Sequence, residues 1–538
     1  TTPSPPPSGP PTFYIKAAEE YKRRALEISE RYQGYVGDVM IFGMGDMGQL
    51  GIPGSGGDGD DEEEEGLSVA SAPRTVMNLR NRGVVRLGCG GLHNAAVTEC
   101  GSVYTWGCND EASLGTFDFD SVDQVQTGYV PRKIGGFRPS RSSPTFPGGS
   151  ADPSSADEAI VQVAAGDCQT LCLSNTGNVY MFGCYRDAEG KQFRDPPPHD
   201  ETRTQREKVA EDRIVEKYMR DNPEPTEEAT REEGERKRNP PAPRGKQLWP
   251  VHCYRTPKRA RFIDCGFSFN AAVLEDGSLV TWGLGEQEGT LGRKVPPMKK
   301  KKGDREVYDL DAIRDLHLMP MPVVYDGLPK LGRTVVEVSC GGYHLLVTAR
   351  DEEDGGAKVE LYTSGLNNYG QLGHGDTTSR AVLTQVEALS GHNVSKVAGG
   401  LHHSIVLDQT RRNLFGFGRG DSGQLGCTDA MPSPGHLEDS PVPIPLPDKG
   451  SDGQSPVVVQ IAAGDHHNLA LTLDGHVYTW GYGDSSALGH GKDEDEYRPR
   501  KLDVLRDPRK REEREAKRRG MSKESVRPMS ATVRQVAG

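Results

Sequence analysis

One pattern of glycines and alternating apolar residues recurs seven times along this chain and begins an eighth time. In the stretch "GGLHNAAVTECGSVYTWGCNDEASLG", a glycine pair and a histidine precede two apolar alternations, which end on Trp-Gly and Leu-Gly. An eighth copy starts at "TVRQVAG", where the sequence stops at Gly538. A period of two, broken by "DG", "TG" or "CG", predicts short antiparallel strands joined by tight turns. The seven full copies end at Gly51, Gly115, Asp187, Gly292, Gly373, Gly426 and Gly489.

Seven small sheets in one chain predict an all-β fold, a seven-bladed β-propeller. A single sheet cannot cover both of its faces, but seven sheets stacked around an axis cover one another. We expect residues 1–35 to form a proline-rich start and a helix, and residues 36–538 to form the propeller. The closing repeat is incomplete, so "DVMIFG" is expected to share a blade with "TVRQVAG".

Charged segments interrupt the repeats, and we expect them to lie outside the ring. They cover residues of about 55–75, 194–247, 294–320 and 505–529. Within them, the basic runs Lys299–Lys302 and Arg509–Arg519 are open to several interpretations: nuclear-import signals, contacts to phosphates or acidic protein, or, for the second, a solvated helix.

Composition excludes several classes of function. No stretch approaches the roughly 20 apolar residues that cross a bilayer, so no membrane contact is expected. A net charge of −13 argues against a chain that coats nucleic acid. The ten cysteines include no Cys-x-x-Cys pair, which predicts small buried residues in a reducing compartment and no metal site.

Glycines, aromatics and histidines hold fixed places in the repeat. The glycine pairs suit close approach of backbones near the axis, and the aromatic residue before the closing glycine is expected to pack between blades. The histidines that follow the glycine pairs allow two readings, a structural role inside each blade or a binding surface around the axis. They are His93, His344, His402, His403, His466 and His467.

No set of residues in the sequence predicts catalysis or a cofactor. "GMGDMG" at Gly43 matches a dinucleotide-binding loop only in its spacing, because the repeat ending "QLG" follows it where a helix is needed. No nucleophile, base and orienting group occur at a spacing that would assemble a hydrolase. We therefore expect a protein without catalytic residues, metal or cofactor.

The repeats resemble the family of the regulator of chromosome condensation, in order as well as in kind. The resemblance rests on "GDMGQLG", "GCNDEASLG", "AGDCQT", "GCYRD", "GLGEQEGTLGR", "GGLHH" and "GKDEDEYRP". It implies a guanine-nucleotide exchange factor, not an enzyme, that promotes GDP release from the small GTPase Ran by stabilising its nucleotide-free form. GDP and GTP would be bound by Ran and not by this chain.

The resemblance also implies where the GTPase binds. In the family, a short hairpin called the wedge pushes between two loops of the GTPase, and here "YRDAEGKQF" matches it. The residues implied to bind the GTPase are Asp46, His93, Asp167, Tyr185, Arg186, Asp187, Ala188, Glu189, Gly190, Ser268, His402 and His403. Ser268 stands where the family has an aspartate, and we expect Ser268→Asp to maintain or raise activity.

The resemblance further implies a nuclear monomer that acts in nucleocytoplasmic transport and the cell cycle, with histones or chromatin as further partners. The alternative is a propeller scaffold that binds another protein, in a chromatin or ubiquitin pathway, without exchange activity. Ser268 favours this alternative, whereas the wedge sequence and "KDEDEY" favour exchange.

Overall fold

The computed structural model describes the repeats and parts of the segments between them. The described residues are 38–53, 67–116, 128–137, 158–194, 247–253, 256, 258–285, 287, 289–302, 305–326, 333–351, 358–428, 431–449 and 453–502. The expected helix before residue 35, nearly all of the 194–247 segment, the 505–529 segment and the eighth copy lie outside these residues.

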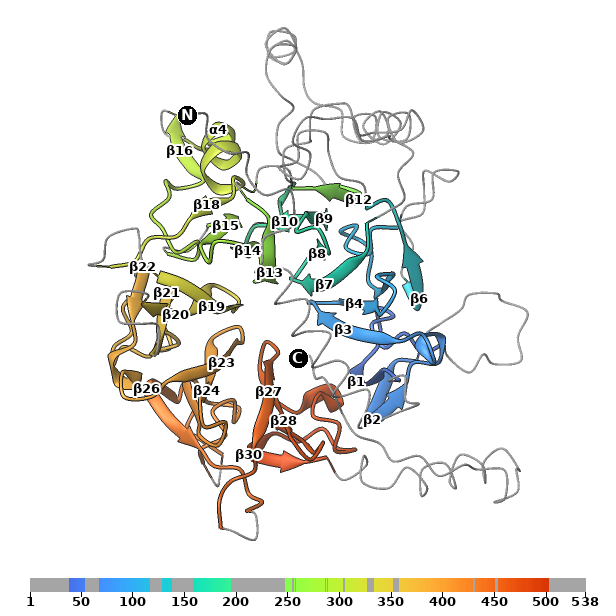
Figure 1. The fold of residues 1–538 in the computed structure, drawn as a ribbon, viewed down its shortest axis with the longest axis vertical. Helices are drawn as coiled ribbons and strands as arrows, with labels where there is room; N and C mark the ends of the chain where they lie inside the picture. Colours follow the sequence, from blue (N-terminus) through green and yellow to red (C-terminus); the bar gives the residue numbers. More distant parts are fainter. Residues whose placement is uncertain are drawn as a thin grey trace, which may run out of the picture.

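Six four-stranded antiparallel sheets surround one axis, which confirms the all-β propeller (Figure 1). We number these blades 1 to 6 in chain order. Blade 1 consists of β3 (Val84–Cys89), β4 (His93–Thr98), β5 (Val103–Gly107) and β6 (Gly128–Ile134). Blade 2 consists of β7 (Ile160–Ala165), β8 (Gln169–Ser174), β9 (Val179–Gly183) and β12 (Gln247–His252). Blade 3 consists of β13 (Ala260–Cys265), β14 (Phe269–Leu274), β15 (Leu279–Gly283) and β18 (Met321–Pro322).

The remaining blades follow the same order from the axis outward. Blade 4 consists of β19 (Arg333–Cys340), β20 (His344–Asp351), β21 (Val359–Gly365) and β22 (Arg380–Gln385). Blade 5 consists of β23 (Val394–Gly399), β24 (His403–Asp408), β25 (Leu414–Arg419) and β26 (Leu437–Ile444). Blade 6 consists of β27 (Val458–Ala463), β28 (His467–Thr472), β29 (Val477–Gly481) and β30 (Glu496–Lys501). The second strands of blades 1, 2, 3 and 5 are buried along their whole length, because neighbouring blades cover both faces.

The first repeat forms a two-stranded sheet in place of a complete blade. β1 (Met40–Met44) pairs with β2 (Val69–Thr75), and this sheet lies between blade 6 and blade 1. The Gly491 amide of blade 6 donates to the Ser71 carbonyl at 2.7 Å, and Trp106 Nε1 of blade 1 donates to the Gln49 carbonyl at 2.9 Å. The described residues thus form six complete blades rather than seven. The expected insertion at 55–75 was also placed too far along the chain, since its last seven residues form β2.

Backbone hydrogen bonds join the blades at the axis. Each inner strand ends in a short turn, and we call residues 90–92, 166–168, 266–268, 341–343, 400–402 and 464–466 the axial turns. The Gly342 amide donates to the Gly400 carbonyl at 3.0 Å, and the Leu401 amide donates to the Asp465 carbonyl at 3.0 Å. A Cβ on Gly400 would lie 2.2 Å from the His403 ring, so glycine is required by space at this turn.

Aromatic side chains fill the space between blades, as the repeat predicts. Trp106, Phe182, Trp282, Phe417 and Trp480 are all at most 1% exposed. The closing glycine of one blade packs directly against the aromatic ring of the next. Glycine is needed at this position because any side chain would clash with the ring. A Cβ on Gly115, for example, would lie 2.8 Å from Phe182.

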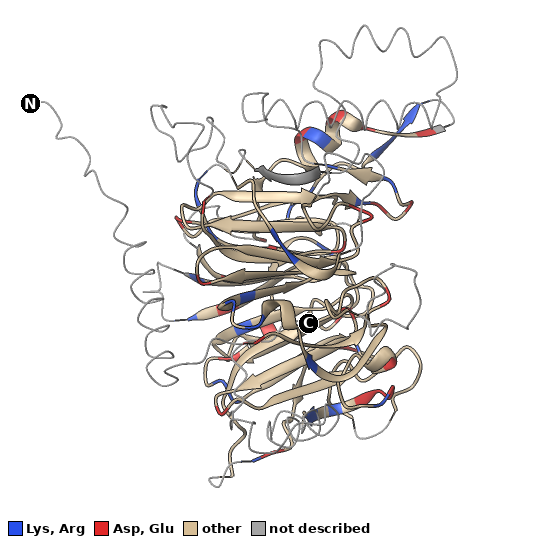
Figure 2. Cartoon of the chain, turned by 90° about the vertical axis from the view of Figure 1, so that its right-hand side faces the viewer, with Lys and Arg blue, Asp and Glu red and all other residues tan. Residues whose placement is uncertain are grey.

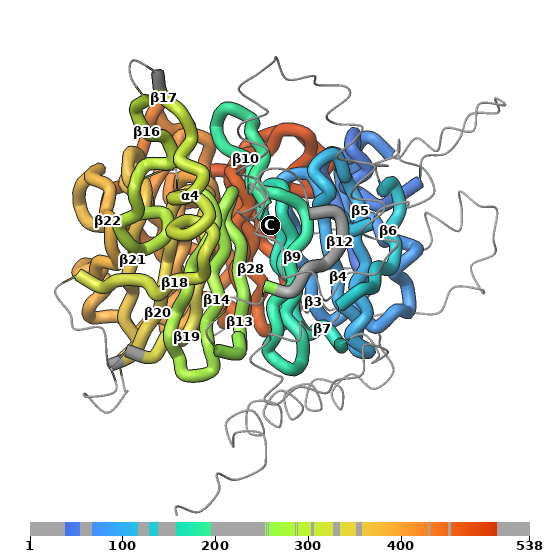
Figure 3. The backbone as a smooth tube through the Cα atoms, turned by 90° about the horizontal axis from the view of Figure 1, so that it is seen from above, coloured from blue at the N-terminus to red at the C-terminus, as the bar shows by residue number. Residues whose placement is uncertain are grey.

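Part of the 294–320 segment forms a structure that stands out from the ring. β16 (Lys299–Lys302) pairs with β17 (Arg305–Tyr308), followed by the short helices α4 (Leu310–Ala312) and η3 (Ile313–His317). Figure 3 shows this hairpin on the same side of the ring as β10, and Figure 2 shows its basic strand near the top of the molecule.

The cysteines lie as the composition predicts, as small buried side chains for the most part. All ten cysteines are free and seven of them are buried. No helix among the described residues is long and apolar enough to cross a bilayer. Across the same residues, no group of three or more His, Cys, Asp and Glu side chains could hold a metal ion.

Candidate functional site

The sequence "YRDAEGKQF" forms the hairpin that its resemblance implied. β10 (Tyr185–Arg186) pairs with β11 (Gln192–Phe193), and the turn between them spans residues 187–191. Asp187 shapes this turn, because its Oδ1 accepts hydrogen bonds from the Glu189 amide at 3.0 Å and the Lys191 amide at 2.8 Å. Gly190 has a φ of +79°, a value that favours glycine. Ala188, Glu189 and Gly190 are exposed at the tip.

The base of the hairpin is anchored in blade 3. Tyr185 is fully buried, and its hydroxyl lies 2.7 Å from the Asn270 side-chain amide of β14. Ser268 Oγ donates to the Arg186 carbonyl at 2.7 Å. The base of the hairpin is therefore fixed to blade 3, next to the axial turns, by hydrogen bonds.

A charged cluster holds the hairpin against blades 1 and 2. Arg186 Nη2 lies 3.1 Å from Asp167 Oδ2, and its Nη1 lies 3.9 Å from Glu111 Oε1. Gln192 Nε2 donates to Glu111 Oε2 at 2.6 Å. Asp167 thus has a partner within the chain, Arg186. Glu111 was missed in the sequence analysis, although it follows the same "Gly-Cys" ending in blade 1 that precedes the hairpin in blade 2.

Aromatic and histidine side chains form a second part of the same face, over blades 4 and 5. The His402 ring lies 4.9 Å from the Tyr369 ring and stacks at 6.3 Å with Tyr343. Arg419 lies over the Tyr369 ring at 5.3 Å and pairs with Asp421 at 2.8 Å. Burial, followed by the charge of Arg419, lowers the pKa of His402 to about 4. His402 is therefore neutral at physiological pH and contributes as a flat polar ring.

Three of the remaining histidines have a structural role and do not form a binding surface. His93 and His403 are each 1% exposed, and their Nε2 atoms lie 2.7 Å from Thr170 Oγ1 and 2.8 Å from Asn468 Oδ1 of the next blade. His344 makes the same contact with Ser404 Oγ at 2.9 Å. These side chains join blades and leave no surface for a partner, so His93 and His403 do not belong to an exposed binding face. The His402 side chain, by contrast, is only half-buried and remains accessible on this face.

The other implied site residues are distributed unevenly. Asp46 is exposed beside β1, whereas Ser268 is 5% exposed under the hairpin. A carboxylate at position 268 would face the Arg186 carbonyl, where both groups only accept hydrogen bonds. From this geometry we expect Ser268→Asp to disturb the base of the hairpin, whereas the resemblance suggested that activity would be maintained or raised.

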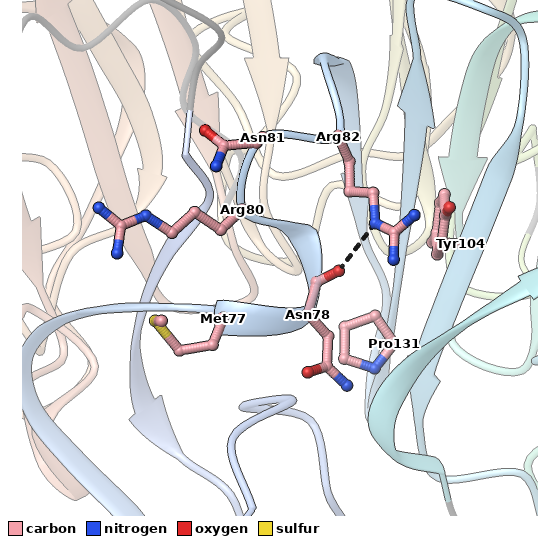
Figure 4. A pocket seen from close by; sticks show the side chains of 7 residues that line it. All are labelled: Met77, Asn78, Arg80, Asn81, Arg82, Tyr104 and Pro131. Atoms are coloured by element: carbon pink, nitrogen blue, oxygen red, sulfur yellow. Dashed lines mark hydrogen bonds between the residues drawn. The ribbon is translucent and has the colours of Figure 1, made fainter.

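A shallow hollow of about 520 Å³ is lined by seven side chains, among them Met77, Arg82 and Tyr104 (Figure 4). It sits beside η1 (Met77–Leu79), near the start of β3, whereas the axial turn lies at the end of that strand. Arg82 Nε donates to the Asn78 carbonyl at 3.4 Å, and its guanidinium lies 5.8 Å from the centre of the Tyr104 ring. Arg80 pairs with Asp38 at 3.5 Å. Both arginines already have partners within the chain, so this hollow is a weaker candidate than the hairpin face.

The comparisons with known proteins agree with the fold. The chain is 26% identical to the mouse protein named regulator of chromosome condensation over 482 residues, which are 89% of this chain and 88% of that one. It is 26% identical to the guanine nucleotide exchange factor SRM1 of Saccharomyces cerevisiae over 498 residues, which are 90% and 84% of the two chains. The crystal structure of Prp20p from the same yeast has a TM-score of 0.59 at 23% identity, covering 86% of this chain and 85% of that one.

The family model described as the RCC1-like domain matches residues 38–517. That match covers every described blade and both of the hairpins, β10–β11 and β16–β17, that stand out from the ring. The chain therefore belongs to the family of RCC1-like domains.

Proposed function

We propose that this chain is a guanine-nucleotide exchange factor for the small GTPase Ran. The observation that carries the proposal is the β10–β11 hairpin, which is anchored at its base by Tyr185 and Ser268 and exposes its tip beside the axial turns. The name of the SRM1 relative, guanine nucleotide exchange factor, supports the same activity.

The arrangement suits exchange by population shift. A factor that binds the nucleotide-free GTPase more tightly than the nucleotide-bound form lowers nucleotide affinity by the same factor. No covalent step is needed for this function. The hairpin tip would enter the GTPase, while Asp46, the Asp167–Arg186 pair and His402 would meet its surface.

The nuclear location, the monomeric state and the contact with histones or chromatin belong to the same proposal. They rest on the family resemblance and on the names of the relatives. The alternative, a scaffold without exchange activity, is favoured by one observation: Ser268 holds the position of a family aspartate and is buried under the hairpin.

Release of fluorescent GDP from Ran separates the two functions. Stopped-flow mixing of the full chain with loaded Ran should give a release rate that rises with the concentration of the chain. No acceleration at micromolar protein would move the assignment to the scaffold. A variant with Ala188, Glu189 and Gly190 deleted serves as the matched control, since it removes the exposed tip and keeps the anchored base.

A further inference from the structure

The β16–β17 hairpin of blade 3 leans against the tip of the β10–β11 hairpin of blade 2. Tyr308, the last residue of β17, donates from its hydroxyl to Asp187 Oδ2 at 2.5 Å and lies 3.1 Å from Glu189 Oε2. Its ring lies 5.6 Å from the Phe193 ring. Lys299, the first residue of β16, forms an ion pair with Glu189. Two segments more than 100 residues apart thus meet at the tip.

The Asp187 carboxylate links these contacts to the shape of the turn. Its Oδ1 accepts from two backbone amides of the turn, and its Oδ2 accepts from Tyr308. Asp187 is only 7% exposed, so these donors take the place of water around its carboxylate oxygens. Removing the Tyr308 hydroxyl would leave one buried oxygen without that donor and loosen the turn that the other oxygen holds.

The charged groups around Glu189 add to the same contact. Lys299 and Lys191 approach its carboxylate from two sides, the second at 3.2 Å. Both ammonium groups also lie over the Tyr308 ring, at 5.1 Å and 4.3 Å from its centre. These hydrogen bonds lower the pKa of Glu189 to about 2. The Glu189 side chain is therefore held in place by these contacts, although it lies at the exposed tip.

We propose that the β16–β17 hairpin is a brace that fixes the tip of β10–β11 in the shape presented to the GTPase. Tyr308 and Lys299 are the positioning residues, and they act through Asp187 and Glu189. The inference rests on the proposed exchange function, and it assigns a role to the lysine run that the sequence left open between import signal and phosphate contact. A preformed tip avoids the cost of ordering it on binding.

The neighbouring lysines supply a matched control. Lys302 is exposed at the far end of β16, away from the pair formed by Lys299. Lys302→Met removes one charge from the same strand without touching Tyr308, Asp187 or Glu189. If the basic run acted only as a charged surface, Lys299→Met and Lys302→Met would have equal effects.

Hydrogen exchange of the full chain tests the brace without any GTPase. Tyr308→Phe and Lys299→Met should each raise amide exchange at residues 187–191 on the order of fivefold, as expected for losing a hydrogen bond to a charged group near the surface. Exchange in β20 should stay unchanged, which separates local loosening from general unfolding. Lys299→Arg and Lys302→Met should keep the protection of the wild-type chain.

GDP release from Ran tests the functional half of the inference. Tyr308→Phe should lower kcat on the order of fivefold and leave KM for Ran·GDP nearly unchanged, because the face at the axial turns is intact. Three results in Tyr308→Phe would each contradict the proposed brace: unchanged amide hydrogen exchange at residues 187–191, an unchanged kcat, or faster GDP release. If the wild-type chain does not accelerate GDP release from Ran, the proposed exchange function is wrong. Amide hydrogen exchange alone then decides whether the brace exists.

Discussion

Arg186 on the β10–β11 hairpin forms an ion pair with Asp167 on the axial turn of blade 2, with 3.1 Å between Nη2 and Oδ2. The Asp167 side chain is 13% exposed and that of Arg186 is 41% exposed. Within this pair, Asp167 is shielded from solvent and Arg186 is accessible to a partner. A partner that contacts Arg186 would act on the hairpin and the axial turn together.

Replacing Asp167 should weaken exchange and leave the fold intact. Asp167→Ala removes the group that orients Arg186, and we expect GDP release from Ran to slow about tenfold or more, as for a shielded charge at an interface. Stopped-flow release measures the effect, with circular dichroism as the folding control. The Asp167→Ala/Arg186→Ala double variant should be no slower than the slower single variant, because the two residues act as a unit. GDP release at the wild-type rate by a folded Asp167→Ala protein would show that the Asp167–Arg186 pair is not part of the binding face.

Ser268→Asp should lower the release rate. The serine hydroxyl donates to the Arg186 carbonyl at 2.7 Å, and an ionised aspartate can only accept, so the hairpin base would be pushed from the axial turn. Ser268→Thr keeps a donor and serves as the conservative control. GDP release and hydrogen exchange at 185–193 measure both variants. An active Ser268→Asp protein would show that the base of the hairpin adapts to a carboxylate.

The sequence predicted those features that repeat along the chain. The glycines of the axial turns, the aromatics between blades and the order of the strands all recur, so each copy supports the assignment of the others. The hairpin at 185–193 could be placed only through the family resemblance, because two strands of two residues leave no periodic signal.

Features that depend on contacts between distant segments could not be predicted. Nothing near Tyr308 in the sequence indicates that its hydroxyl meets Asp187, 121 residues earlier. Likewise, His402 and His403 are adjacent in sequence and differ in burial, because His402 lies in the axial turn and His403 begins β24. The burial that decides between them appears only once the blades are packed.

The histidines between blades should make the fold sensitive to acid. Burial lowers the pKa of His344 to about 3 and those of His93 and His403 to about 4, from an ordinary value of 6.5. The unfolded chain therefore binds more protons between these values. Stability is complete above pH 6.5 and falls as the pH drops toward 4, by about 2 kcal/mol per histidine at pH 5.

A glutamine in place of one histidine should reduce this sensitivity. Gln169 already holds the equivalent place in blade 2, where its Nε2 donates to the Gly266 carbonyl at 3.1 Å. His344→Gln should therefore lose less free energy of unfolding between pH 7 and pH 5 than the wild-type chain. Urea unfolding at the two pH values measures the difference. An equal loss in both proteins would show that His344 is not among the groups that take up protons.

The β1–β2 sheet should open more readily than the complete blades. Within the described residues β1 pairs with β2 alone, and its register shifts between Ile41 and Gly43. Phe42 is only partly buried, whereas its counterpart Trp480 in blade 6 is fully buried, so less apolar surface holds this sheet to its neighbours. Amides of Met40–Met44 should therefore exchange about ten times faster or more than those of β24, whose six residues are all buried. Hydrogen exchange with mass spectrometry at several times measures both strands in one sample. Protection of β1 equal to that of β24 would mean that this sheet is as firmly closed into the ring as a four-stranded blade.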